Sequence, residues 1–172
     1  GERPFRRRAF QESPMEEFIK WEEVQIMLAF GVAERQPHYL VVGEHYMTAS
    51  FTTDYAVHFT RRSALTCGMD ILYDESLEYS IKGVPPPEVD PIMQFYFGGH
   101  MGYQFKIDRF TLLINLGTYF KHYSYDREFF FARAGGRYRI SKHLAGHLCI
   151  KSRNGIRSDW IEWGLAYSIK TR

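Results

Sequence analysis

Three side chains near one predicted hairpin have the types and spacing of a hydrolytic catalytic group. His122 and Ser124 are two positions apart, so on a β-strand their side chains lie on the same face. Glu128 begins the next predicted strand, where its carboxylate could orient the histidine. A histidine that takes the proton of a serine hydroxyl supports nucleophilic attack on an ester. The segment HYSYDRE that contains them is also what any polar hairpin loop looks like, and this is the competing interpretation.

The elements that must position such groups are β-strands, because apolar and polar residues alternate along most of the chain. From Phe110 to Phe120 every second residue on one side is large and apolar, whereas the other side carries Asn115, Gly117 and Lys121. The segments 51–59, 93–105, 130–140 and 160–169 show the same alternation. A soluble sandwich buries its apolar face, whereas a transmembrane barrel turns that face to lipid and its polar face to the lumen. The pattern therefore predicts an all-β fold.

Composition narrows the classes of protein. Aromatic residues make up 17% of the chain, which is typical of a β-rich protein with aromatic belts. The net charge of +2 gives no indication of a nucleic-acid partner. Cys67 and Cys149 are too few for a disulfide framework, and we expect two free, buried thiols. No run of about 18 apolar residues occurs, so the sequence predicts no membrane-spanning helix.

Eight strands are expected after an N-terminal tail. Residues 1–22 lack strand periodicity, and Ser13-Pro14 could begin a short helix or an extended segment there. Residues 23–172 are expected to form the barrel domain. The predicted strands span 24–35, 45–60, 64–75, 92–106, 109–121, 128–141, 144–153 and 159–170.

The connections between these strands alternate in length. They are short at 61–63, 107–108 and 141–143, and longer and polar at 36–44, 76–91, 122–127 and 154–158. Outer-membrane barrels have short periplasmic turns, longer extracellular loops and an even number of strands. A soluble eight-stranded barrel around a hydrophobic ligand is the alternative, but it shows less asymmetry. We therefore predict an eight-stranded antiparallel up-and-down transmembrane β-barrel, embedded in a bacterial outer membrane.

The polar face is expected to fill the lumen. Eight strands leave an interior just wide enough for side chains, which argues against a transport channel. Opposite charges inside can neutralise one another, as buried charges must. The residues expected to point inward are Asp54, His58, Asp70, His100, Asn115, Arg133, Arg137, His147, Lys151 and Glu162.

Four stretches carry a resemblance to a known family: SALTCGMDILYD, FGGHMGYQF, ARAGGRYRISKHLAGHLCIKS and DWIEWGLAYSIK. They resemble the Bacteroidetes branch of the acyloxyacyl hydrolase family, which is related to the lipid A 3-O-deacylases of the PagL type. The resemblance runs from about Trp21 to the end of the chain. It implies an outer-membrane barrel of a Gram-negative bacterium, and a hydrolase that removes an ester-linked acyl chain from lipid A.

The resemblance also implies where the catalytic groups lie. The family has a His-x-Ser pair on the next-to-last strand and a carboxylate near the last strand, acting as a triad. The matching residues here are His147, Cys149 and Glu162, with cysteine in place of the serine nucleophile. The alternation puts all three on the lumen face, whereas lipid A lies outside the barrel. Either the predicted register is wrong by one residue, which would reverse every side chain, or the three residues only fill the lumen.

Basic residues at the loop end could contact the membrane lipid. Arg127, Arg153 and Arg157 could meet the phosphates of lipopolysaccharide, because guanidinium matches phosphate geometry. Surface arginines also occur without any specific partner. Ser152, near the same rim, is a further candidate nucleophile. We expect neither a cofactor nor a metal site.

Two functions remain open at this point. The first is an esterase acting on lipid A, which the family context favours. The second is a non-catalytic barrel, a structural or accessory subunit of a larger assembly with other outer-membrane proteins. The cysteine at the serine position favours the second.

Overall fold

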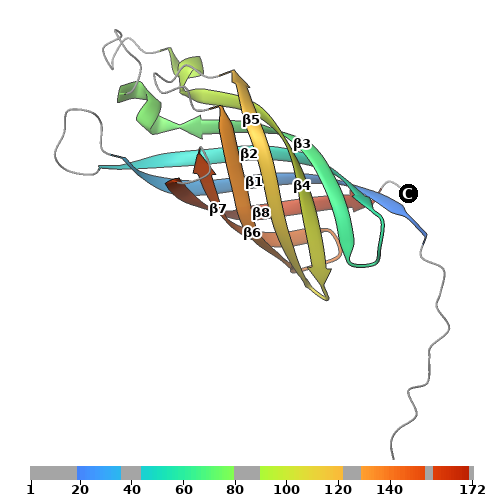
Figure 1. The fold of residues 1–172 in the computed structure, drawn as a ribbon. Helices are drawn as coiled ribbons and strands as arrows, with labels where there is room; N and C mark the ends of the chain where they lie inside the picture. Colours follow the sequence, from blue (N-terminus) through green and yellow to red (C-terminus); the bar gives the residue numbers. More distant parts are fainter. Residues whose placement is uncertain (1–18, 36–43, 80–89, 122–128, 154–156, 171–172) are drawn as a thin grey trace, which may run out of the picture.

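Eight antiparallel strands close into a barrel in this computed structural model, which describes residues 19–35, 44–79, 90–121, 129–153 and 157–170. Each strand pairs with its neighbours in sequence, and β8 returns to pair with β1 (Figure 1). The predicted up-and-down barrel is therefore confirmed. The strands are β1 (Trp21–Arg35), β2 (Glu44–His58), β3 (Ser63–Asp74), β4 (Phe95–Ile107), β5 (Phe110–Lys121), β6 (Phe130–Arg139), β7 (Leu144–Arg153) and β8 (Arg157–Lys170).

The largest differences from the predicted boundaries lie at the starts of β1 and β4. β1 begins at Trp21, inside the expected tail, and β4 begins at Phe95 rather than at residue 92. Residues Pro91–Gln94 instead form the 3-10 helix η3, in which the Asp90 side chain accepts a hydrogen bond from Ile92 N–H at 3.0 Å. Proline has no N–H for a strand ladder, so pairing starts after it. The predicted N-terminal helix lies outside the described residues.

The described connections distinguish the two ends of the barrel (Figure 1). The β2–β3, β4–β5 and β6–β7 turns form the short-turn end. The opposite end, called the long-loop end here, holds the last residues of β1, β3, β5 and β7, together with η1 (Glu75–Tyr79) and η3. The tightest short turn places Asp108 at a φ of 52°, a left-handed conformation that aspartate tolerates better than most residues. Among the described residues, no helix is long and apolar enough to cross a membrane.

The outer face of the barrel is apolar. Leu28, Met101, Leu116 and Trp163 are between 54% and 72% exposed, and they belong to a large set of outward aliphatic and aromatic side chains. A soluble barrel with the aromatic face inward is therefore the wrong alternative. A continuous apolar exterior is costly in water, whereas it matches the lipid-facing band of a transmembrane barrel.

The lumen is filled by the residues predicted to point inward, all ten of which are buried. Near the long-loop end a cluster of apolar side chains closes the interior: Leu72, Leu77, Tyr96, Tyr119, Phe131 and Trp160. The buried Lys151 ammonium lies 4.3 Å from the centre of the Phe131 ring. Both cysteines are free, as expected, but only Cys149 is buried. The expectation of a buried Cys67 is wrong, because Cys67 occupies an outward position of β3.

Candidate functional site

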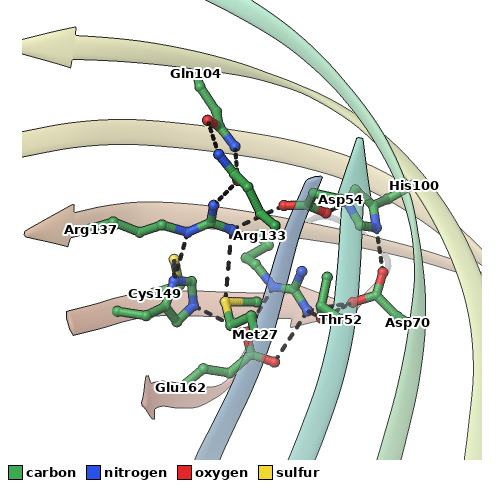
Figure 2. Close-up of polar contacts among 12 residues, drawn as sticks. Met27, Thr52, Asp54, Asp70, His100, Gln104, Arg133, Arg137, Cys149 and Glu162 are labelled. Atoms are coloured by element: carbon green, nitrogen blue, oxygen red, sulfur yellow. Dashed lines mark hydrogen bonds and ion pairs between the residues drawn. The ribbon is translucent and has the colours of Figure 1, made fainter. Parts of the chain in front are cut away.

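A connected polar network occupies the centre of the lumen, and Arg133 of β6 is its main cation (Figure 2). Its Nε donates to Glu162 Oε2 at 2.7 Å, and its Nη2 donates to Asp70 Oδ1 at 2.6 Å. Nη2 also contacts Thr52 Oγ1 at 3.3 Å. Arg133 thus joins carboxylates from β8 and β3, which are not neighbours in the barrel wall.

His100 and Arg137 extend this network toward the short-turn end. The His100 ring lies between two carboxylates, with Nδ1 against Asp70 and Nε2 2.7 Å from Asp54 Oδ1. Arg137 Nη2 donates to Asp54 Oδ2 at 3.0 Å, and its Nη1 donates to Gln25. Each of the three carboxylates of this network, Asp54, Asp70 and Glu162, therefore has a cationic or imidazole partner, which is what makes burial of these charges tolerable.

His147, Cys149 and Glu162 lie together beside this network. Cys149 Sγ is 3.8 Å from His147 Nδ1, and His147 Nε2 is 4.0 Å from Glu162 Oε2. The three groups thus stand in the order thiol, imidazole, carboxylate, which is the order of a nucleophile, its base and an orienting acid. The thiol–imidazole distance fits a weak S–H hydrogen bond, whereas 4.0 Å is too long for a direct hydrogen bond to the carboxylate.

The local sequence explains why these groups face inward. Leu148 is 60% exposed, so its neighbours His147 and Cys149 point into the lumen, and Cys149 stands opposite Glu162 in the β7–β8 register. Gly135 pairs with Cys149 from the other side, and a Cβ built on Gly135 would lie 2.5 Å from Cys149 Sγ. The predicted register therefore holds, and the suggestion that it is wrong by one residue is not correct.

Competing contacts limit the chemistry of this arrangement. Cys149 and Glu162 are each 1% exposed, so an ester reaches the sulfur only if the wall or the lumen opens. Arg137 Nε also approaches His147 Nδ1, at 3.4 Å, which is the nitrogen that would take the thiol proton. The Glu162 carboxylate is bound by Arg133 and lies 3.8 Å from Lys151 Nζ.

The structure describes only some of the remaining predicted site residues. His122, Ser124, Arg127 and Glu128 fall outside the described residues. Arg153 and Arg157 pair with each other at the last step of the β7–β8 ladder, and Ser152 is partly exposed beside them. In the described part of the chain, no group of three or more His, Cys, Asp or Glu side chains could hold a metal ion.

Two features escaped prediction from the sequence. Gln25 of β1 and Gln104 of β4 exchange hydrogen bonds of 2.9 and 3.3 Å across the lumen. A set of basic side chains also gathers at the short-turn end, around one cavity. The sequence could have indicated this set, because lysines and arginines lie in or beside every predicted short turn and at the end of β8. They are Arg62, Lys106, Arg109, Arg139, Lys142 and Lys170.

Comparison with known proteins points to one family. A solved structure described as "De novo design of transmembrane beta-barrels" is similar at 14% identity and a TM-score of 0.47, over 87% of this chain and 95% of that chain. No curated protein matches the chain. The family described as acyloxyacyl hydrolase, C-terminal domain (PagL_C), matches residues 22–171, which span the barrel from β1 to β8.

Proposed function

The chain belongs to the acyloxyacyl hydrolase C-terminal domain family, and from this premise we propose that it is an outer-membrane enzyme that hydrolyses an ester-linked acyl chain of lipid A. The match over residues 22–171, nearly the whole described barrel, is the observation that carries the proposal. The barrel expected over residues 23–172 is the catalytic domain in this proposal, with its start moved to Trp21, where β1 begins. The short-turn end faces the periplasm, as in other outer-membrane barrels. The motifs RYRISKHL and DWIEWG support a place in the Bacteroidetes branch.

Cys149 is the proposed nucleophile, with His147 as its base. The thiol proton passes to His147 Nδ1, 3.8 Å away, and the thiolate attacks the ester carbonyl. The sugar hydroxyl leaves with the proton from the imidazole, and a thioester remains on Cys149. Water then hydrolyses the thioester and releases the fatty acid. Glu162, whose Oε2 lies 4.0 Å from His147 Nε2, stabilises the positive charge on His147 during both steps.

The lipid is proposed to approach at the long-loop end. The apolar exterior of the barrel lies among acyl chains, and Arg127, Arg153 and Arg157 are proposed to contact the phosphates of lipopolysaccharide. The backbone positions of Arg153 and Arg157, at the long-loop end of β7 and β8, support this role. His122, Ser124 and Glu128 remain a second proposed catalytic group at this end. They rest on the sequence alone, and Ser152 is a further sequence-based nucleophile.

The burial of Cys149 favours a second candidate function. A thiol that is 1% exposed, beside a carboxylate already bound by Arg133, is typical of a structural lumen. On this second proposal the chain is a non-catalytic outer-membrane barrel, a structural or accessory subunit that associates with other outer-membrane proteins.

One experiment separates these functions. The barrel, purified in detergent, is incubated with lipopolysaccharide, and the mass of lipid A is followed over time. The enzymatic proposal predicts the loss of one hydroxyacyl chain. Cys149→Ala and His147→Ala abolish this loss if the lumen group is catalytic, whereas Ser124→Ala abolishes it if the loop group is.

Cys149→Ser is the informative companion variant, because it restores the family's nucleophile at nearly the same volume. An active Cys149→Ser barrel, with an inactive Cys149→Ala barrel, would establish the lumen site. Unchanged lipid A with the wild type and with Cys149→Ser, in barrels that are folded, contradicts the enzymatic proposal and favours the accessory subunit.

A further inference from the structure

The lumen opens at the short-turn end into a cavity of about 590 Å³. The proposed catalytic residues His147, Cys149 and Glu162 do not line this cavity. Its floor is formed by Gln25, Gln104 and Arg137, which belong to the lumen network. Its wall includes Trp21 at the start of β1, which stacks on His58 with ring centroids 3.4 Å apart. A volume of this size is in the range of pockets that bind small molecules.

The cavity is strongly basic. Beyond Arg137, six lysine or arginine side chains line it: Arg62, Lys106, Arg109, Arg139, Lys142 and Lys170. Three of them lie on strands β4, β6 and β8, and each of the three short turns supplies one more. Glu23 is the single acidic side chain among its described lining residues, and it lies 3.4 Å from His58.

The positive charge around the cavity is not neutralised within the described residues. There, no ion pair involves Arg62, Lys106, Arg109, Lys142 or Lys170. Lys170 and Lys106 hold their ammonium groups 4.2 and 5.6 Å from the centre of the same Trp21 ring. This contrasts with the lumen centre, where Arg133 and Arg137 both contact carboxylates. Like charges brought together in a concave site with low-dielectric walls create a field that attracts anions.

We propose that this cavity binds a multivalent phosphate-bearing anion, a free organic phosphate or the headgroup of a lipid, which enters from the short-turn end. Several cations converge from different strands, which suits an anion with more than one negative charge. Arg62 and Arg109 supply guanidinium forks, which match phosphate oxygens, and the lysines add point charges. The indole of Trp21 gives an apolar wall for the organic part of the ligand.

The test is calorimetric titration of the full-length barrel in an uncharged detergent, with pyrophosphate as the probe. We expect binding that weakens steeply between low and physiological salt, because the contacts are ionic. Arg62→Gln and Lys142→Gln should each lower the affinity by about tenfold, the loss typical of one charge-assisted hydrogen bond. Arg61→Gln is the matched control, since Arg61 is adjacent in the same turn but does not line the cavity, and it should leave the affinity unchanged.

A second titration, with a short-chain phosphatidic acid below its micelle concentration, identifies the source of the phosphate, because the phosphomonoester headgroup of this lipid carries more than one negative charge near neutral pH. Tighter binding of the lipid than of pyrophosphate indicates a headgroup, and the reverse order indicates a soluble phosphate. Failure of both probes to bind at low salt overturns the proposal, as does equal weakening by Arg62→Gln and Arg61→Gln. Neither readout requires esterase activity, so this proposal and the proposed function fail independently.

Discussion

Arg133 Nε lies 2.7 Å from Glu162 Oε2, and both side chains are buried in the lumen. The same carboxylate oxygen is 4.0 Å from His147 Nε2. Glu162, the acid at the family's catalytic position, is therefore mainly the counterion of Arg133. Its distance to His147 is longer than its distance to Arg133. The stability of the barrel and the proposed chemistry consequently share one carboxylate.

Replacing Arg133 by methionine should destabilise the barrel by about 3–5 kcal/mol, because it leaves Asp70 and Glu162 buried without their main cation. The measurement is unfolding by urea in lipid vesicles, followed by tryptophan fluorescence. Arg139→Met is the control on the same strand, since that side chain is exposed and should change the free energy of unfolding by only about 0.5 kcal/mol. Equal effects from the two variants would contradict the importance of the central pair.

The two thiols should react at very different rates in the folded barrel. Cys67 lies on the outer face and Cys149 is buried, so an apolar maleimide should label one thiol per chain in detergent and both in urea. Mass spectrometry of peptides identifies which cysteine has reacted. Rapid labelling of Cys149 in the folded state would show that the lumen opens, and would strengthen its role as a nucleophile.

Gly135→Ala should disturb the proposed catalytic group through packing alone. A Cβ at this position would lie 2.5 Å from both the Cα and the Sγ of Cys149, so β7 or the cysteine must shift. We expect a loss of about 1–3 kcal/mol in the free energy of unfolding, as for other overpacked interiors. Gly99→Ala is the matched control, because its nearest neighbour would be 3.5 Å away, and it should be tolerated. Similar melting temperatures for the two variants would refute the close approach of β6 and β7.

A charge on the outer face should cost more at mid-strand than at the barrel end. Leu116, in the middle of β5, is 66% exposed, and its replacement by arginine should destabilise the barrel by about 2–4 kcal/mol in a bilayer. Phe110→Arg, at the short-turn end of β5, should cost only about 0–1 kcal/mol. The comparison is made by unfolding in vesicles, and no depth dependence would contradict the lipid-facing orientation.

Several features of the chain could be predicted from its sequence because they depend on local periodicity. The alternation of side chains is set by strand geometry, so Leu148 outward required His147 and Cys149 inward. The short turns were predictable because few residues connect adjacent antiparallel strands. The start of β4 was predicted three residues too early, at residue 92, because Pro91 begins the 3-10 helix η3 and strand pairing starts only at Phe95.

The sequence by itself determined which residues enter the lumen, but only the tertiary structure decided which of them meet. Asp70, Arg133 and Glu162 lie on β3, β6 and β8, and their contacts depend on closure of the barrel and on the stagger of its strands. The same closure carries Lys106 and Lys170 to one indole ring and gathers separate short turns around one cavity. Strand periodicity specifies a face for each residue, whereas contacts across a lumen depend on distances that no local pattern encodes.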